Sequence, residues 1–413
     1  MIRTSRYLPL AAAAILLCAG MPGSAEVIGT MTPGEPLSET RIASLPAAQR
    51  AVWTEYWRRS LERTSADKAA LAAERQGLAH IPAGPPTGGT ASMPLGRDPT
   101  WYGSDEARGI AATIISFQTP AGGWDKNQDR AGPPRLRGQT WGSVGTIDNG
   151  ATTTELRFLA RVQLALPGQD GVGLRAAFLK GLRYLLEAQY PNGGWPQYYP
   201  LQGGYHDAVT FNDDALVNAS QLLADVAARE EAYAFVPDAL AAEAQRAVDR
   251  SVLLIVRTQV VAGGKHTGWG QQHDAISLMP VGARNFEPAS LASNESSSLL
   301  AFLMELPNPS PEVVRAIHDG AAWLEARALL DLEWTGAEPD GRRLRPKLGT
   351  RPLWARFYDI RTMCPIFGDR DKTIHDDVNE LSLERRNGYS WFGNHPARVL
   401  GLYRTWAISH LVN

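Results

Sequence analysis

Three segments of the chain share one pattern, in which a glutamine precedes a glycine-rich turn and a tryptophan. They are FQTPAGGWDKN with Gln118 and Trp124, AQYPNGGWPQYY with Gln189 and Trp195, and RTQVVAGGKHTGWGQQHD with Gln259 and Trp269. The glutamines follow one another after 71 and 70 residues, and each interval has room for two helices. A single hairpin of this size cannot bury its apolar face alone, so neighbouring hairpins must stack.

Helical periodicity covers most of the chain, and strand signals are scarce and short. Helices are predicted over residues 46–75, 103–118, 153–165, 172–189, 213–230, 239–259, 289–306, 311–330 and 394–412. Stacked hairpins with alternating inner and outer helices predict an all-α fold, an incomplete (α/α) toroid whose long loops form an open cleft. A flat solenoid of the same hairpins is the alternative.

The N-terminus has the layout of a secretory signal peptide. Arg3 and Arg6 precede the apolar run 8–17, and the small residues at 23–25 suit a cleavage site. No later run approaches the roughly 18 apolar residues of a transmembrane helix. We therefore expect residues 1–25 to be a signal peptide and the mature chain to be secreted or periplasmic, without a membrane anchor.

The mature chain contains a Pro- and Gly-rich break, PAGPPTGGTASMP, at residues 82–94. Residues 26–97 are predicted to form an N-terminal leader and helical extension. Residues 98–413 are predicted to form the catalytic domain, the α/α toroid. We expect the protein to be a monomer.

Oxygen-bearing side chains gather where turns open helices. Asp148 and Asn149 open one predicted helix, and Asp213 opens the next inner one. Ca²⁺ takes six to eight such ligands and tolerates irregular geometry, so adjacent inner helices could share one cation. Helix capping is the competing explanation, because Asp and Asn also satisfy free N–H groups at a helix start. Zinc is not expected, since the eight histidines lack H-x-x-x-H spacing.

The three repeated tryptophans are predicted to lie at one end of the toroid, where they could form the floor of a cleft. Sugar rings present apolar C–H faces, so Trp124, Trp195 and Trp269 would suit a polysaccharide. A purely structural role remains the alternative, because a large aromatic side chain that closes a helical turn buries much area by itself.

Residues 342–386 are rich in arginine, whereas the whole chain has a formal net charge of -2. Arginine holds carboxylates or phosphates through paired hydrogen bonds, so this stretch is a place to bind an anion. A net acidic, exported protein matches a nucleic acid duplex poorly, and no nucleic acid partner is expected. An anionic polysaccharide fits the pattern better.

Eight strings occur in a specific order over about residues 98–412. They are GGWDKN, TIDNGATTTELRFLA, AQYPNGGWPQYYP, TFNDDAL, ARNFEPASL, PLWARFYDI, PIFGDRDK and ERRNGYSWFG. In this set and order the chain resembles the pectate lyases of polysaccharide lyase family 10. The resemblance implies an incomplete α/α toroid whose cleft binds polygalacturonate and cleaves it by Ca²⁺-dependent β-elimination.

The resemblance also implies roles for single residues. Arg370, in GDRDK, matches the arginine that abstracts the proton, and Asp148 belongs to the same catalytic set. Asp148, Asn149 and Asp213 match positions that bind calcium or lie against it. The expected substrate contacts are Lys126, Arg284 and Arg356, joined by the aromatic candidates Trp269 and Tyr389.

Two residues depart from the family pattern: Asp125 stands in place of a proline, and Lys372 in place of a glycine. Either change puts a subsite in doubt, but neither removes a catalytic group.

The chemistry agrees with these roles. The C5 proton of a galacturonate lies next to a carboxylate, so its removal needs calcium and cationic side chains to neutralise the developing charge. Arginine can serve as the base only if neighbouring positive charge and exclusion of water depress its pKa. The alternatives are a hydrolase with paired acids on a similar toroid and a non-catalytic pectin-binding protein. Only elimination leaves a 4,5-unsaturated end.

Overall fold

The computed structural model describes residues 27–85, 93–166, 168–337 and 339–410. The predicted signal peptide, residues 1–25, lies outside the described residues. Within the described part of the chain, no helix is both long enough and apolar enough to cross a membrane.

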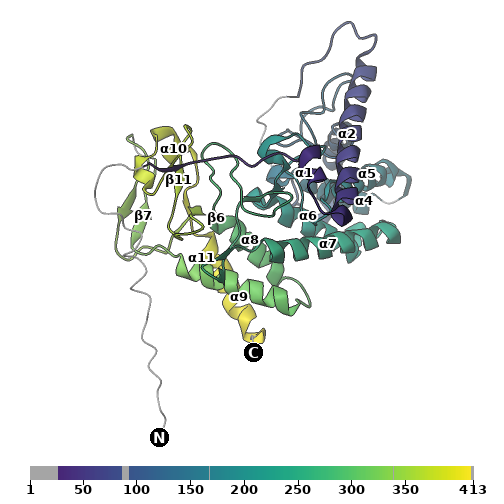
Figure 1. Ribbon diagram of the computed structural model, residues 1–413. Coiled ribbons are helices and arrows are strands. Elements are labelled where there is room, and N and C mark those ends of the chain that lie inside the picture. Colours follow the sequence, from purple (N-terminus) through teal and green to yellow (C-terminus); the bar gives the residue numbers. More distant parts are fainter. Residues whose placement is uncertain (1–26, 86–92, 167, 338, 411–413) are drawn as a thin grey trace.

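Helical hairpins stack side by side and form the incomplete α/α toroid that the repeat predicts (Figure 1). One row contains α4, α6, α8 and α11, each in contact with the next, and the other contains α3, α5, α7 and α9. The bounds are α3 Asp105–Ser116, α4 Thr153–Ala165, α5 Val172–Ala188, α6 Ala215–Ala227, α7 Asp238–Thr258, α8 Ser293–Met304, α9 Pro311–Ala326 and α11 His395–Trp406. Because α4, α6 and α8 are mostly buried, this row is the inner one.

The repeated glutamines join successive hairpins. The Gln118 amide donates to the carbonyl of Gly122 in its own turn and to that of Ala177 in α5, at 2.8 and 2.9 Å. Gln189 makes the same pair of bonds to its turn and to α7, and Gln259 makes it to its turn and to α9. The 70-residue period therefore reflects one recurring hydrogen-bonded joint between neighbouring outer helices.

The repeated tryptophans are core residues and do not line a cleft. Trp124, Trp195 and Trp269 are all 0% exposed. Each indole N–H donates to a backbone carbonyl of the preceding outer helix, at 2.7–2.8 Å. The prediction that Trp269 contacts substrate is therefore wrong, because no sugar can reach a ring enclosed in the core. The structural alternative is correct for all three.

A fourth tryptophan completes this series. The indole N–H of Trp354 donates to the carbonyl of Leu324 in α9 at 2.8 Å. Sequence analysis missed this repeat because a long insertion separates the helix from its tryptophan, whereas the first three turns are short.

The insertion between α9 and α11 forms a lobe of short strands around a small helix, α10 (Leu383–Gly388). Its strands are β7 Leu332–Trp334, β8 Leu344–Pro346, β9 Trp354–Ala355, β10 Phe357–Tyr358, β11 Phe367–Gly368, β12 Thr373–His375 and β13 Phe392–Gly393. The remaining strands are β1 Val27–Thr30, β2 Val209–Thr210, β3 Val261–Ala262, β4 Lys265–His266, β5 Gln272–His273 and β6 Leu291–Ala292. Pairs β2–β5 and β6–β10 link turns of neighbouring hairpins, and so they brace the end of the toroid where the polar turns lie.

The N-terminal leader crosses the molecule. Strand β1 pairs antiparallel with β12 of the lobe, and the chain then runs to α1 (Glu39–Ala43) and to the long helix α2 (Ala47–Arg75) on the helical body (Figure 1). Along this path the N–H of Leu37 donates to Asp207, and Arg41 pairs with Asp274 at 2.5 Å. The leader therefore connects the lobe to the toroid.

Candidate active site

Two short turns lie in contact at the polar end of the toroid. Turn η3 (Asp148–Gly150) leads to α4, and turn η6 (Asn212–Asp214) leads to α6. The two turns have the same unusual backbone, because Asn149 and Asp213 have φ values of 52° and 50°. Left-handed backbone at non-glycine residues is costly and tends to gather at functional sites. The inner row of helices therefore brings Asp148, Asn149 and Asp213 together, as predicted.

Neither aspartate caps its helix. The carboxylate of Asp148 is buried, with Oδ2 paired to the Lys126 amine and Oδ1 without a hydrogen-bond partner in the described structure. Oδ2 of Asp213 accepts a hydrogen bond from the Asn212 amide at 2.8 Å. Since the starts of α4 and α6 receive no side-chain cap, capping does not explain why these residues stand there.

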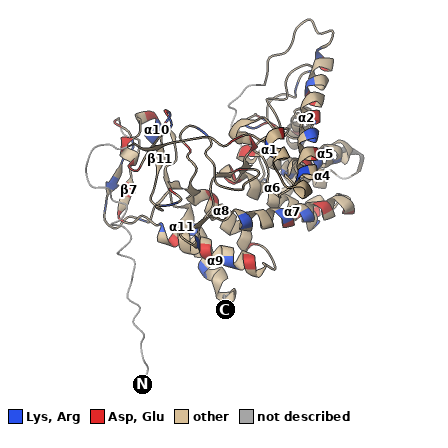
Figure 2. Cartoon of the chain, viewed as in Figure 1, with Lys and Arg blue, Asp and Glu red and all other residues tan. Residues whose placement is uncertain are grey.

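These turns form one wall of a pocket of about 360 Å³. Its lining residues are Lys126, Asp148, Asn149, Gln197, Tyr198, Tyr205, His206, Asn212, Asp213, Gln271, Gln272, Ala283, Arg284 and Glu287. Lys126, Asp148, Asn149, Asp213 and Arg284, five of the predicted site residues, thus share one cavity. Both charge signs are interspersed along α2, α7 and α9 (Figure 2).

Arg284 is held in the pocket wall by Glu287. The guanidinium Nε and Nη2 donate to the two carboxylate oxygens at 2.8 and 2.5 Å, and the Tyr389 hydroxyl donates to the same carboxylate at 2.7 Å. Burial alone would lower the pKa of Arg284, but the pair with Glu287 outweighs it and raises the pKa. Nη1 makes no hydrogen bond within the described part of the chain and remains available to a ligand.

Arg356 and Tyr389 do not line the pocket, although both were predicted to contact substrate. The Arg356 side chain is 10% exposed and pairs with Glu295 at 3.0 Å. The same Nη2 donates to Asn212 at 3.2 Å, so Arg356 supports the pocket from behind. Tyr389 stands behind Glu287 and packs against Phe357. The structure thus gives both residues supporting positions.

Arg370 lies outside the pocket. Its side chain is 61% exposed and pairs with Glu384 through two hydrogen bonds of 3.1 and 3.2 Å. The pair with Glu384 raises the pKa of Arg370. The depressed pKa that an arginine base requires is therefore not found for Arg370 in this structure, because the lobe supplies a carboxylate partner, Glu384. The backbone carbonyl of Arg370 accepts from the Asn285 amide at 3.1 Å, which places the residue near the rim that carries Arg284.

The two departures from the family pattern have separate structural consequences. The Asp125 carboxylate accepts from the N–H groups of Lys126 and Ser143, at 2.8 and 2.6 Å, and so ties the segment that carries Lys126 to a neighbouring loop. Lys372 has a φ of 74°, in a left-handed conformation that favours glycine.

Sequence analysis missed the part of the pocket built by residues 197–206. His206 lies between two tyrosine rings, with ring centroids 4.0 Å from Tyr205 and 5.0 Å from Tyr198. Its Nδ1 is 2.5 Å from Oε1 of Gln197, and burial together with nearby Lys126 lowers the pKa of His206. This loop directly follows the Gly-Gly-Trp turn that ends at Trp195, and its place beside a repeated turn was the sequence feature that could have identified it.

The donor set fits a hard divalent cation. Asp148 Oδ1 is a buried oxygen without a hydrogen-bond partner among the described residues. Burial and the neighbouring Asp148 carboxylate raise the pKa of Asp213, as two acids crowded together do. No group of three or more His, Cys, Asp or Glu side chains that could hold a metal occurs in the described ranges. Two carboxylates and the Asn149 amide would therefore need further oxygens from a substrate or water to complete a calcium shell.

Comparison with known proteins identifies the family. The model of the pectic acid lyase family matches residues 118–400. A family 10 polysaccharide lyase from Cellvibrio cellulosa is 32% identical with a TM-score of 0.67, and the match covers 78% of this chain and 99% of that one. A point mutant of that lyase in complex with trigalacturonic acid gives the same identity and TM-score over 74% of this chain and 95% of the other. Among proteins with curated descriptions, none matches at a significant level.

The matched region contains the inner helices α4, α6 and α8, both polar turns and Arg284, and it extends through the lobe into α11. A match over most of the chain and the shared fold lead to one conclusion: this chain belongs to the pectic acid lyases, polysaccharide lyase family 10.

Proposed function

We propose that the protein is a pectate lyase that cleaves de-esterified polygalacturonate by calcium-dependent β-elimination and releases 4,5-unsaturated oligogalacturonates. The observation that carries the proposal is the pocket in which Lys126 and Arg284 face the oxygens of Asp148, Asn149 and Asp213. We further propose that residues 1–25 direct export to the periplasm or the medium, that residues 26–97 extend the catalytic toroid of residues 98–413, and that the protein acts as a monomer.

The charge of the pocket supports a cation requirement. Its lining has three carboxylates, Asp148, Asp213 and Glu287, against the cations Lys126 and Arg284. One negative charge in excess would repel a polyanionic substrate. Calcium, when held by Asp148, Asn149 and Asp213, supplies the positive charge that neutralises the substrate carboxylate and the negative charge that develops on it.

The two cations of the pocket have different tasks in the proposal. Lys126 reaches the substrate carboxylate from beside Asp148, which keeps its amine charged: burial alone would lower the pKa of Lys126, but the hydrogen bond to Asp148 outweighs it. Arg284 takes the role of base that the family resemblance implied for Arg370, because Arg284 is the arginine in the pocket lining and its Nη1 is free to approach the C5 proton. Burial opposes the effect of Glu287 on the pKa of Arg284, and bound calcium would oppose it further.

The bond changes balance without a co-reactant. Arg284, in its unprotonated form, takes the proton as the C5–H bond breaks, and the electron pair of that bond moves onto the neighbouring carboxylate. This pair forms the C4–C5 double bond as the C4–O bond breaks. The leaving oxygen takes a proton from water, and the hydroxide that remains takes the proton back from Arg284. Arg356 contributes indirectly, because its hydrogen bond to Asn212 holds that residue beside Asp213.

The test follows ultraviolet absorbance of the unsaturated product during incubation with polygalacturonate. We expect absorbance to rise with Ca²⁺ and to stop rising when excess EDTA is added, with recovery on restoring Ca²⁺. Highly methyl-esterified pectin should be the poorer substrate, because an ester removes the carboxylate that pairs with Lys126 and Arg284.

Three outcomes would contradict the proposal. Full turnover in EDTA would remove calcium from the mechanism. New reducing ends without ultraviolet absorbance would indicate a hydrolase. Retention of polygalacturonate without shortening would indicate a binding protein.

A further inference from the structure

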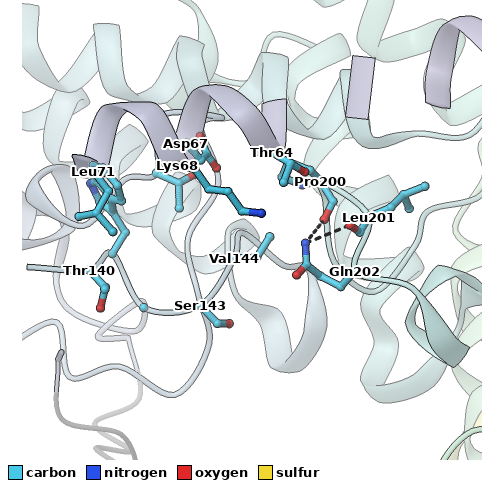
Figure 3. Close-up of a pocket in the computed structure, with 13 residues that line it drawn as sticks. Thr64, Asp67, Lys68, Leu71, Thr140, Ser143, Val144, Pro200, Leu201 and Gln202 are labelled. Carbon is cyan, nitrogen blue, oxygen red and sulfur yellow. Dashed lines mark hydrogen bonds between the residues drawn. The ribbon is translucent and has the colours of Figure 1, made fainter. Parts of the chain in front are cut away.

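A second pocket, of about 410 Å³, lies between helix α2 and two loops of the toroid (Figure 3). We call it the α2 pocket. It is lined by Thr64, Asp67, Lys68, Leu71, Thr119, Thr140, Trp141, Gly142, Ser143, Val144, Pro200, Leu201 and Gln202. Helix α2 lies before the family match, which begins at residue 118. The pocket therefore combines an element from outside the matched region with loops from within it.

The α2 pocket presents a cation, hydroxyl groups and an aromatic ring. The amine of Lys68 extends from α2 into the space towards Gln202 (Figure 3). Lys68 forms no ion pair with any residue that the structure describes. The Trp141 ring is half-buried, with the guanidinium of Arg135 at 4.0 Å from its centroid. A free cation beside hydroxyls and a ring is the combination that binds an acidic sugar.

The acid of this pocket, Asp67, is turned towards protein partners. Its Oδ1 accepts from the N–H of Ala121 at 2.8 Å. Burial raises the pKa of Asp67 to about 6, while Lys180 and Arg63 act to lower it. The negative charge of Asp67 is thus offset by Lys180 and Arg63. Lys68 is the charge that points into the cavity.

The two pockets are lined by neighbouring stretches of the chain. Tyr198 lines the catalytic pocket and Pro200 lines the α2 pocket, so their Cα atoms are at most about 7 Å apart. A single carboxylate, that of Asp125, lies between Ser143 of the α2 pocket and Lys126 of the catalytic pocket, bonded to the backbone N–H of each. A polymer bound in the catalytic pocket therefore has only a short distance to span to the α2 pocket.

We propose that the α2 pocket binds a uronate unit of the same polymer that occupies the catalytic pocket, with the uronate carboxylate on Lys68 and the sugar ring against Trp141. The inference rests on the proposed function and extends it: the N-terminal helix adds a distal subsite that only long substrates fill. A short oligomer occupies the catalytic pocket and leaves the α2 pocket empty.

The experiment compares Lys68→Ala, Lys68→Arg and wild type on long polygalacturonate and on trigalacturonate. We expect Lys68→Ala to raise the KM for the long polymer about fivefold, the scale of one exposed ion pair, with kcat unchanged. The KM for trigalacturonate should stay within about twofold, and Lys68→Arg should retain most of the long-chain advantage. Lys265→Ala, at an exposed lysine of β4, is the matched control and should resemble wild type on both substrates.

Two results would overturn the inference: an unchanged KM for the long polymer in Lys68→Ala, or equal changes for both substrates. If wild type releases no unsaturated product, the proposed function fails, and the subsite is then tested by measuring the binding of polygalacturonate. Electrophoresis in gels that contain polygalacturonate then decides the matter. Weaker retardation of Lys68→Ala than of wild type and Lys265→Ala supports the subsite, and equal retardation of all three rejects it.

Discussion

Arg284 and Arg370 differ in where their guanidinium groups lie. Arg284 lines the pocket beside Asp213 and Lys126, while Arg370 stands in the lobe with 61% of its side chain exposed. Each guanidinium donates two hydrogen bonds to a glutamate, and in both cases that pair raises the pKa of the arginine. Position and not pKa therefore separates the two arginines.

Replacement of each arginine by lysine should reveal this difference. Arg284→Lys should lower kcat by about 100-fold or more, because a lysine amine cannot occupy the guanidinium position relative to the C5 proton. Arg370→Lys should keep kcat within about tenfold of wild type, a barrier change of ~1.4 kcal/mol, with the larger effect on KM. Steady-state kinetics and a separate measurement of oligogalacturonate binding check both. The reverse pattern would return proton abstraction to Arg370.

Strand β5 shows how a short element sets the floor of the pocket. It supplies Gln272 to the lining and pairs with β2, and its other residue, His273, is fully buried. The His273 Nε2 accepts the N–H of Gly270 at 2.9 Å, and Nδ1 donates to the carbonyl of Leu278 at 2.8 Å. Both ring nitrogens are thus engaged in the neutral form, and burial lowers the pKa of His273 to about 4.

Acid should destabilise the fold through His273. The folded-state pKa lies below the ordinary value of 6.5, so the unfolded chain takes up the proton first as the pH falls. The loss should amount to about 3 kcal/mol of unfolding free energy between pH 6.5 and 4, with no further loss below that window. Urea unfolding of wild type and His273→Gln across this range measures it.

The comparison with the variant is necessary because two acids, the half-buried Asp67 and the buried Asp207, act in the opposite direction. Asp67 and Asp207 have pKa values raised to about 6, mainly by burial. Through these two acids the protein loses unfolding free energy as the pH rises. Both acids remain in His273→Gln, and the difference between the two proteins isolates the histidine. An identical pH dependence in the two proteins would show that His273 does not cause the loss.

On the scale of the whole molecule, the N-terminal leader holds the lobe against the toroid next to the active site. Pro33 bridges to Gly282, and the N–H of Gly34 donates to the Gly282 carbonyl at 2.7 Å. Gly282 lies two residues before Arg284. A Cβ built on Gly282 would lie 2.5 Å from the backbone carbonyl oxygen of Thr32, so the leader leaves no room for a side chain there.

Gly282→Ala should therefore separate the leader from the loop that carries Arg284. We expect a loss of about 1–3 kcal/mol in unfolding free energy, because backbone must shift to admit the methyl group. The kcat/KM on polygalacturonate should fall as well, since the same loop positions Arg284. Gly336→Ala is the matched control: nothing lies within 4 Å of its Cβ, so both quantities should stay near wild type. Wild-type stability of Gly282→Ala would show that the leader is loosely attached.

The sequence by itself determined the helices and the joints between them. The predicted bounds of α4 were exact, and α2 begins one residue after its predicted start. Apolar residues three and four positions apart indicate a helix. The recurring glutamine and tryptophan indicate the joints, because they make the same contacts in each hairpin. The turn oxygens of Asp148, Asn149 and Asp213 were predictable because each stands where a polar turn opens a predicted helix.

Only the tertiary structure decided which side chains meet in the pocket. Whether Trp269 faces core or solvent depends on neighbouring helices, and whether Arg284 or Arg370 enters the cavity depends on Glu287 and on the path of the lobe. Strands of two or three residues have no periodicity to detect, and their partners lie far away in the sequence, as β1 and β12 do. The same holds for the α2 pocket, whose walls come from three distant parts of the chain and exist only once the long-range packing is complete.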